Sequence, residues 1–400
     1  MTTASSPRAL TDGPAVGARF GRRQVHSVAA CYFVASFAAL GLPPYLTEIL
    51  PALGDSTARW AGLLYVVPTV FGALGAPLWG RAADRFGRKR LLLRAQLGLA
   101  VSFLLAGWAD SLGAFTAALV LQGILGGTFA ASNGYLAAAL TGSDLSRALT
   151  LMQGAARAAL VFAPIVVGSL TPWISPHRQY ALLAVLPLTA AAMLALLPEP
   201  GTRRAEAAET GPSEATGPLS PLKALYAFEF AFVFSTVISF PYLIQLIEDR
   251  IPGVSPALSG ALFALPHLCY LLFAIRVHQV FERRPAAGIA TGFALVALGL
   301  AGHGAADSLP SFVAVRLLLG AGLTLGLVSL SVLAADCARG RPPGGMFGTL
   351  ELVSKGGAVA AGLAAAAGSS LFGPSAPVLT GTAIALAALL AAVLPATFRS

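Results

Sequence analysis

The sequence predicts an all-α membrane protein in which twelve transmembrane helices form two pseudo-symmetric six-helix bundles. The prediction rests on composition, on the spacing of apolar runs and on an internal repeat. Of 400 residues, 56% are hydrophobic and 11% are charged, and the mean hydropathy is +0.77. A soluble protein of this length carries about a quarter charged residues. Because the charges are missing from long stretches rather than thinned evenly, we expect the chain to cross a membrane many times.

Apolar runs long enough to cross a bilayer recur along the chain, since about 20 residues of helix span roughly 30 Å of hydrocarbon. The first six runs are 25–50, 60–80, 91–109, 114–139, 147–171 and 179–197. The second six are 222–247, 257–277, 286–303, 311–333, 345–371 and 376–396. The first run is too long for a signal-peptide core and has no convincing small-residue cleavage site, so we expect it to be retained.

A polar break separates the two sets of runs. Its sequence, PEPGTRRAEAAETGPSEATGPLSPLK (198–223), is rich in Pro, Gly, Ala and Glu, a composition typical of a flexible linker. The expected organisation is a cytoplasmic N-terminal tail (1–24), a first six-helix bundle (25–197), a cytoplasmic linker (198–221), a second six-helix bundle (222–396) and a cytoplasmic C-terminus (397–400).

The two bundles carry a weak internal repeat. The tripeptide PYL at 44–46 recurs at 241–243, an offset of 197 residues. At an offset of 198 the matches are Gly62 with Gly260, Pro68 with Pro266, and Asp84-Arg85 with Glu282-Arg283. A nearly constant offset across neighbouring runs is hard to obtain by chance, so the sequence predicts two repeats of six helices.

Lys and Arg residues are distributed unequally between the two sides of the membrane. If the N-terminus is cytoplasmic, the cytoplasmic segments hold 20 of the 26 basic residues, as the positive-inside rule requires. The opposite side holds Arg59, Arg178 and Arg250, and the apolar runs contain Arg157, Arg316 and Lys355. Arg316, near the outer end of its run, either snorkels to the surface or takes part in transport. The net charge of +9 therefore reflects positive-inside anchoring, and no nucleic-acid partner need be invoked. The expected location is the cell (inner) membrane, which the chain crosses many times.

The loop after the second run carries the sharpest motif, GRAADRFGRKR (80–90). It fits G-x-x-x-D-R-x-G-x-K-R at Gly80, Asp84, Arg85, Gly87, Lys89 and Arg90. This is the signature of the major facilitator superfamily, which the chain resembles along nearly its whole length. The resemblance implies that these residues act as a conformational latch. Its repeat, HQVFERRP (278–285), keeps only Glu282-Arg283, and Pro285 replaces the glycine.

Two further segments resemble family signatures in part. LVLQGILGG (119–127) has Leu119 where proton-coupled members show the arginine of R-x-x-Q-G, so that proton-relay role does not transfer. APIVVGS (163–169) is similar to the antiporter signature G-P-x-x-G-G, with Pro164 and Gly168 matching. This favours a drug:proton antiporter, and the alternative is a kinked helix that packs closely.

Arg157 lies in the middle of an apolar run, about ten residues or roughly 15 Å from Arg147 at the end of its predicted helix. A charge at that depth costs around 3 kcal/mol, so it should face a cavity or a partner. The repeat offset of 198 places Lys355 at the equivalent position of the second bundle. Two cations across a pseudo-twofold axis predict a site for an anion. The alternative is internal pairing of Lys355 with Glu351 and of Arg157 with Glu229.

Few other ionisable residues lie within the apolar runs. Glu229 and Glu351 are the only carboxylates well inside the predicted hydrocarbon region and are candidates for proton coupling. His267 is a third candidate, with a hydrogen-bonded packing role as the alternative. The predicted polar lining of a substrate site consists of Gln122, Asn133, Tyr135 and Gln153. Runs three, six, nine and twelve carry no charge in their interiors, and in the facilitator fold these four lie outermost.

These features predict a secondary active transporter and no enzyme. The expected function is proton-coupled export of a small organic molecule, anionic or carboxylate-bearing and siderophore- or drug-like, by alternating access. The alternative is a symporter that imports a small anionic metabolite, and a more remote one is a membrane sensor or enzyme. No cofactor is expected beyond a gradient of protons or another ion, and the three scattered cysteines predict neither a disulfide framework nor a metal site. The expected partners are the substrate, protons and the bilayer, and the chain is expected to work as a monomer.

Overall fold

The computed structural model describes residues 21–140, 142–197, 219–338 and 343–394. All regular elements in these ranges are helices, as predicted. Eleven helical segments of the described residues are long and apolar enough to cross a membrane, and a shorter apolar stretch, Ala61–Ala76, supplies the twelfth crossing. The prediction of an all-α membrane fold with twelve crossings is therefore confirmed.

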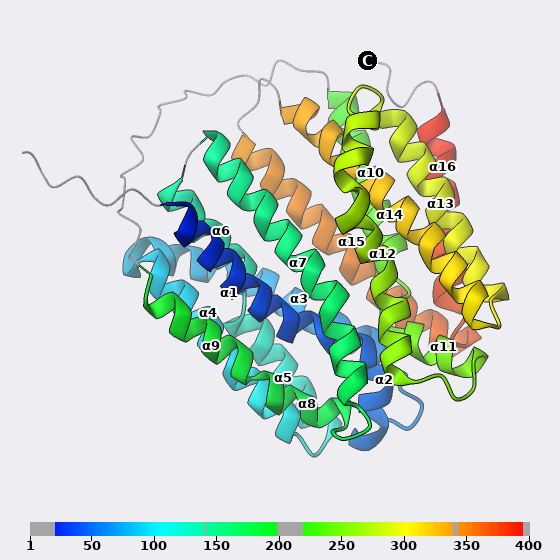
Figure 1. Cartoon of the computed structure of the whole chain (residues 1–400), viewed down its shortest axis with the longest axis horizontal. Helices are drawn as coiled ribbons and strands as arrows, with labels where there is room; N and C mark the ends of the chain where they lie inside the picture. Colours follow the sequence, from blue (N-terminus) through cyan, green and yellow to red (C-terminus); the bar gives the residue numbers. More distant parts are fainter. Residues whose placement is uncertain (1–20, 141, 198–218, 339–342, 395–400) are drawn as a thin grey trace, which may run out of the picture.

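The first half contains eleven elements (Figure 1). They are α1 (Arg22–Gly41), η1 (Pro43–Tyr45), α2 (Leu46–Ile49), η2 (Leu50–Leu53), α3 (Ala61–Phe86), α4 (Arg88–Trp108), α5 (Leu112–Leu125), α6 (Thr128–Ala139), α7 (Gly142–Leu170), α8 (Pro176–Leu183) and α9 (Val185–Ala195).

The second half repeats this pattern after residue 218. Its elements are α10 (Leu219–Val237), η3 (Phe240–Tyr242), α11 (Leu243–Arg250), α12 (Pro256–Phe281), α13 (Pro285–Ala305), α14 (Leu309–Ala338), α15 (Pro343–Phe372) and α16 (Ala376–Val393). We call the side where α1 and α10 begin the linker end, and the side where α2 and α11 lie the far end (Figure 1).

The repeated tripeptide PYL has the same local structure in both halves. Pro43 begins the short 3-10 turn η1, and η3 contains Pro241 at the corresponding position. Proline lacks the backbone N–H that would continue an α-helix, so each long helix stops here and restarts as α2 or α11. The first crossing therefore bends at Leu42 instead of continuing straight over the predicted range 25–50.

The fourth crossing also differs from the prediction, which placed one helix over 114–139. The structure breaks it into α5 and α6 at Gly126 and Gly127. Gly127 has a φ of +83°, a left-handed conformation that costs glycine little. A break in a helix within the membrane is tolerated only where other groups satisfy the freed carbonyls, and two side chains described below do so.

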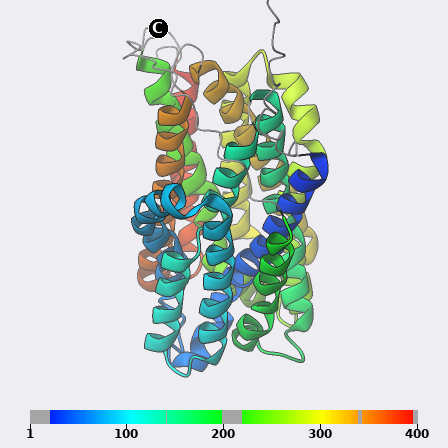
Figure 2. The same cartoon turned by 90° about the vertical axis from the view of Figure 1, so that its left-hand side faces the viewer.

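The two halves meet along α7 against α12 and α3 against α15 (Figures 1 and 2). The backbones touch where glycines face each other at the far end. A Cβ built on Gly62 would lie 2.5 Å from the carbonyl oxygen of Gly362, and one on Gly168 would overlap the carbonyl of Pro256. Small residues at these positions allow the halves to approach closely without side chains between them.

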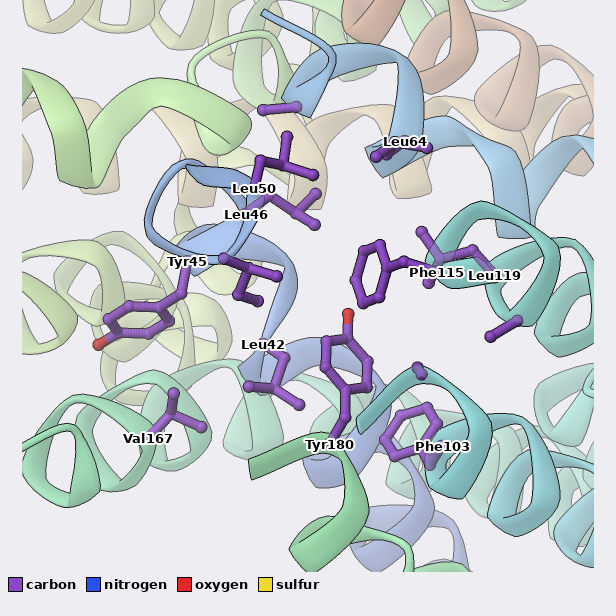
Figure 3. Close-up of a cluster of buried hydrophobic side chains, with 14 of the residues drawn as sticks. Leu42, Tyr45, Leu46, Leu50, Leu64, Phe103, Phe115, Leu119, Val167 and Tyr180 are labelled. Atoms are coloured by element: carbon purple, nitrogen blue, oxygen red, sulfur yellow. The ribbon is translucent and has the colours of Figure 1, made fainter. Parts of the chain in front are cut away.

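A continuous apolar cluster fills the far end and includes residues of both halves. Figure 3 shows Leu42, Leu46, Phe115 and Tyr180 packed together, with the ring of Tyr45 turned away from them toward α7. The edge-to-face contact of Phe115 with Tyr180, 5.4 Å between ring centroids, is one of several aromatic pairs in this cluster. Apolar packing between residues of both halves thus fills the far end.

Candidate functional site

Arg157 lies at the interface between the halves. Its helix α7 packs against α12, and its Nη1 lies 3.4 Å from Nδ1 of His267. The guanidinium also lies 5.4 Å from the ring centroid of Tyr270, one helical turn further along α12. Arg157 therefore faces a polar and aromatic partner surface, as its cost in lipid requires.

His267 is almost fully buried, with aromatic contacts to Phe240 and Phe263. A guanidinium can only donate hydrogen bonds, so Nδ1 of His267 must accept, and the ring carries its proton on Nε2. A second proton would place an imidazolium directly beside Arg157. This geometry favours the hydrogen-bonded packing role over proton coupling for His267.

The two candidate carboxylates lie in the same region. Glu229 on α10 accepts a hydrogen bond from Ser354 on α15 and interacts electrostatically with Arg157 and Glu351. Tyr32 on α1 interacts with both Glu351 and Arg157. We call Tyr32, Arg157, Glu229, Glu351 and Lys355 the central cluster; it joins helices of both halves and contains as many carboxylates as cations.

Lys355 is paired with Glu351 on its own helix. Its Nζ lies 3.3 Å from Oε1 of Glu351, and the two side chains are 40% and 48% exposed. The sequence-based alternative of an i, i+4 pair is thus confirmed for Lys355. Arg157 has Glu229 as an electrostatic partner. The two cations predicted to hold one anion are therefore each close to a carboxylate of the chain.

A cavity of about 550 Å³ lies between α1, α3, α4, α5 and α6, and Lys355 of α15 reaches its wall. Gln122 lies in the wall as predicted, and Arg88 and Arg94 add two further cations. The lining residues that the structure describes include no carboxylate. Arg157 is not among them, so the geometry brings Lys355 and not Arg157 to this cavity.

The break between α5 and α6 shapes the cavity wall. The last carbonyls of a helix have no partner within it, and here Trp79 and Arg94 supply one. Nε1 of Trp79 donates to the carbonyl of Ile124 at 2.7 Å, and Nη2 of Arg94 donates to the carbonyl of Gly126 at 3.2 Å. The Arg94 guanidinium stacks on the Trp79 ring, 3.5 Å from its centroid. Its Nε and Nη1 have no hydrogen-bond partner.

Sequence reasoning did not select Arg94 or Trp79. The expectation that run three carries no charge in its interior is wrong, because Arg94 lies six residues inside the helix that follows the Arg-rich loop, deeper than membrane anchoring requires. Its neighbours Arg88 and Arg90 made it look like one more positive-inside residue. Only the break in the fourth crossing explains why a cation is placed there.

The other predicted lining residues lie elsewhere. Tyr135 is fully buried in an apolar cluster with Val28 and Met152. Gln153 is exposed on α7, and Asn133 has a buried Oδ1 with no partner. None of the three is among the residues that line the cavity.

The motif loop is described in part. Gly87 has a φ of +95° and makes the tight turn between α3 and α4, which explains the glycine. Lys89 donates to the carbonyls of Ala195, at 2.9 Å, and Leu197 at the end of α9. Arg85 and Arg90 are exposed. Gly80 and the side chain of Asp84 lie outside the described part of the chain. The described contacts hold the first half together, and the latch between halves remains a prediction.

The antiporter-like segment of α7 is a contact surface. The carbonyl of Pro164 accepts a hydrogen bond from Tyr45 at 2.6 Å. A Cβ on Gly168 would overlap that tyrosine hydroxyl, and one on Gly260 of α12 would overlap the Pro164 carbonyl. The structure supports the close-packing interpretation of Pro164 and Gly168.

Arg316 is fully buried, so the snorkelling interpretation is wrong. Its Nε donates to the carbonyl of Leu262 at 2.8 Å and its Nη2 to that of Phe263 at 2.7 Å. Pro266 lies four residues after Leu262 and has no N–H to offer that carbonyl. Arg316 therefore replaces a helix hydrogen bond that proline removes from α12.

The chain folds as two six-helix halves, and the cavity described above is lined by Arg88, Arg94, Lys355 and mostly apolar residues. The sequence profile of the Major Facilitator Superfamily matches residues 28–280, and the chain belongs to that superfamily. It therefore has the multi-pass helical fold of that superfamily, and the predicted family and fold are confirmed.

Similar proteins include several named multidrug resistance proteins. The chain is 35% identical over 155 residues to multidrug resistance protein MdtG of Yersinia enterocolitica, a match over 38% of this chain and 36% of that protein. It is 33% identical over 168 residues to MdtG of Serratia proteamaculans, over 41% of this chain and 39% of that protein. The match thus spans about two fifths of the length of these curated relatives.

Solved structures show the same fold over nearly the whole chain. The human organic anion transporter MFSD10 (TETRAN) aligns with a TM-score of 0.66 at 21% identity, covering 92% of this chain and 98% of that one. The POT family transporter PepTSo aligns with a TM-score of 0.73 at 15% identity, covering 93% and 97%. At these identities the likeness concerns the fold alone.

Proposed function

We propose that the chain exports a small organic anion in exchange for protons by alternating access. The observation that carries this proposal is the charge of the cavity, whose described lining contains Arg88, Arg94 and Lys355 and no carboxylate. A cleft lined by charge of one sign concentrates ligands of the opposite sign. The multidrug resistance relatives support export.

The cavity suits an aromatic or amphipathic carboxylate of drug-like size. Its volume of about 550 Å³ lies within the range of small-molecule sites. Trp79 offers an aromatic surface, Gln122 offers amide donors, and two nitrogens of Arg94 lack a partner. A siderophore-like carboxylate and a drug-like carboxylate would both meet these groups.

The central cluster links substrate to conformation in this proposal. An anion that binds Lys355 must compete with Glu351, which lies 3.3 Å from its ammonium. Glu351 also interacts with Glu229, and Glu229 with Arg157 at the interface of the halves. Substrate binding therefore changes which charges are paired across that interface, and a ligand shifts a conformational equilibrium by such differential contacts.

A proton on Glu351 would affect how tightly Lys355 binds the anion. A protonated Glu351 would release Lys355 and strengthen anion binding, and by linkage the anion would strengthen proton binding. That local effect favours movement of the anion and the proton together, which is the symport alternative. Exchange requires a further proton site, away from the anion, that returns the empty carrier.

Transport by the purified protein in proteoliposomes tests the proposal. Radiolabelled salicylate and a naphthalene sulfonate would represent anions, and tetraphenylphosphonium would represent cations, with an imposed pH gradient. We expect transport of the anions and its loss in Arg94→Gln and Lys355→Gln. Arg147→Gln is the matched control, because Arg147 is an exposed arginine of the first half that lies outside the motif loop and does not line the cavity. Transport of the cation alone, or full anion transport by both cavity variants, would refute it.

A further inference from the structure

The first PYL repeat places a tyrosine across the interface of the halves at the far end. The hydroxyl of Tyr45 donates to the carbonyl of Pro164 at 2.6 Å and lies 3.2 Å from the carbonyl of Pro256. Pro256 begins α12, so this second contact reaches the other half. Tyr45 is fully buried.

The second PYL repeat does the same in the opposite direction. The hydroxyl of Tyr242 donates to the carbonyl of Arg59 at 3.1 Å and accepts from the backbone N–H of Gly62 at 3.2 Å. Gly62 lies in the first turn of α3, where backbone N–H groups have no partner within the helix. The two tyrosines, 197 residues apart, thus each bond the half to which they do not belong.

These bonds close the far end because no space is left around them. A Cβ on Gly168 or on Gly260 would overlap the Tyr45 hydroxyl, and one on Gly62 would lie 2.5 Å from the Gly362 carbonyl. The same backbone atoms must separate if the cavity is to open on this side. Breaking the tyrosine contacts is therefore part of any opening of the far end.

A pair of acidic residues lies beside these tyrosines. Glu48 on α2 and Glu248 on α11 come from different halves, interact with each other, and both interact with Tyr45. Oε1 of Glu48 is shielded from solvent and has no hydrogen-bond partner. Oγ1 of Thr47 and Oε1 of Gln245, on the same two short helices, are likewise without one.

No cation neutralises this pair among the described residues that interact with it. The electrostatic partners of the two carboxylates are each other, Tyr45 and the neighbouring Asp249. The other ionisable side chains near this end, on the segments that adjoin α2 and α11, are Asp55, Arg59, Tyr65, His177, Arg178, Tyr180, Tyr242 and Arg250. Two negative charges that are brought together away from water repel each other, and a single proton removes the repulsion.

We propose that Glu48 and Glu248 form a proton-binding pair that controls a gate at the far end, which Tyr45 and Tyr242 hold closed. With a proton on the pair, the tyrosine bonds and the glycine contacts keep the halves together. When both carboxylates are ionised, their repulsion pushes α2 and α11 apart, and the tyrosine bonds break. Glu48 and Glu248 belong to opposite halves, so their repulsion acts directly on the interface.

Exchange of the anion for a proton needs a proton site away from the anion, which the central cluster does not provide and this gate does. In that respect the inference rests on the proposed function. A proton taken up from the far side after substrate release would close the gate and return the carrier to its present conformation. The proton site is separate from the cavity, because neither Glu48 nor Glu248 lines it. The gate itself can be measured without any substrate, so a wrong substrate class would not affect the result.

The test measures the far-end separation directly in the full chain, in lipid nanodiscs and without substrate. Spin labels would be attached at Ser56→Cys in the first half and Pro252→Cys in the second, two exposed far-end positions. The native cysteines are buried and should stay unlabelled. Distances between the labels would be measured by double electron–electron resonance at pH 5 and pH 8. The population with the longer distance should be about tenfold larger at pH 8 than at pH 5, which corresponds to a change of about 1.4 kcal/mol in the free energy of opening.

Variants separate the roles of the two parts. The double variant Glu48→Gln with Glu248→Gln should keep the short distance at both pH values. Asp110→Asn, which changes an exposed acid just after α4 that is not an electrostatic partner of the pair, should behave as wild type. Tyr45→Phe with Tyr242→Phe should raise the long-distance population already at pH 5. A pH response that survives the double glutamine change would overturn the proton-binding pair. Tyrosine variants with wild-type distances would overturn the lock.

Discussion

Replacing Glu351 by glutamine is the perturbation that most directly examines how the cavity binds an anion. The change removes one negative charge and keeps the shape of the side chain. Lys355, which lies 3.3 Å from Glu351 and reaches the cavity wall, loses its partner. An anion would then bind Lys355 without first displacing a carboxylate, so its affinity should rise.

The size of the effect follows from the geometry of the pair. At 3.3 Å two unit charges attract by about 1 kcal/mol at the dielectric constant of water, and by about 5 kcal/mol at an effective value of 20. Because the side chains are 48% and 40% exposed, the lower figure applies, and exposed pairs contribute about 0.2–1 kcal/mol. At most about 1 kcal/mol becomes available to the ligand, which is roughly a fivefold increase in affinity.

Calorimetric titration of the purified protein with salicylate at pH 8 and constant salt would measure this affinity. The Glu351→Gln protein should bind salicylate up to about fivefold more tightly than the wild type. Glu282→Gln is the matched control, since Glu282 is a similarly exposed acid paired with His278 near the end of α12. Unchanged or weaker binding by Glu351→Gln would refute the assignment of Lys355 as an anion ligand.

Three further predictions concern the scaffold. Arg316→Met should lower the free energy of unfolding by about 1 kcal/mol less in a Pro266→Ala background than in the wild type, because the restored backbone N–H can bond the carbonyl of Leu262. Thermal unfolding of the single and double variants measures this difference, and an equal loss of stability in both backgrounds would argue against it. Gly87→Ala should destabilise the protein by roughly 1 kcal/mol, because a side chain is strained at the φ of +95° found there. The variant should therefore have a lower melting temperature, and an unchanged melting temperature would contradict this reasoning. Gly260→Val should force the far end apart, seen as a longer distance between the spin labels, and a wild-type distance would show that the contact tolerates bulk.

The gross architecture was accessible from the sequence because the bilayer imposes a strong constraint. Runs of apolar residues must be helical in hydrocarbon, so their number and order follow from composition alone. The PYL repeat was visible as a match, and the structure adds that proline ends a helix at both places. The i, i+4 pair of Glu351 and Lys355 was predictable because helical spacing alone brings these side chains together.

Features that depend on packing between helices could not be predicted in the same way. Arg94 joins the cavity because α5 breaks at Gly126 and exposes carbonyls, and nothing in the run 114–139 fixes that break. Arg316 looked like a residue near a membrane surface because its partner carbonyl lies on another helix. Such long-range backbone contacts leave no local pattern in the sequence.

The direction of proton movement tests the central claim of exchange most directly. Proteoliposomes would carry a pH-sensitive dye and salicylate inside, with the membrane potential clamped, and would be diluted into substrate-free buffer. Export of the anion in exchange for protons predicts that the lumen becomes acidic as salicylate leaves. Alkalinisation of the lumen would show that anion and proton leave together, and the chain would then be a symporter.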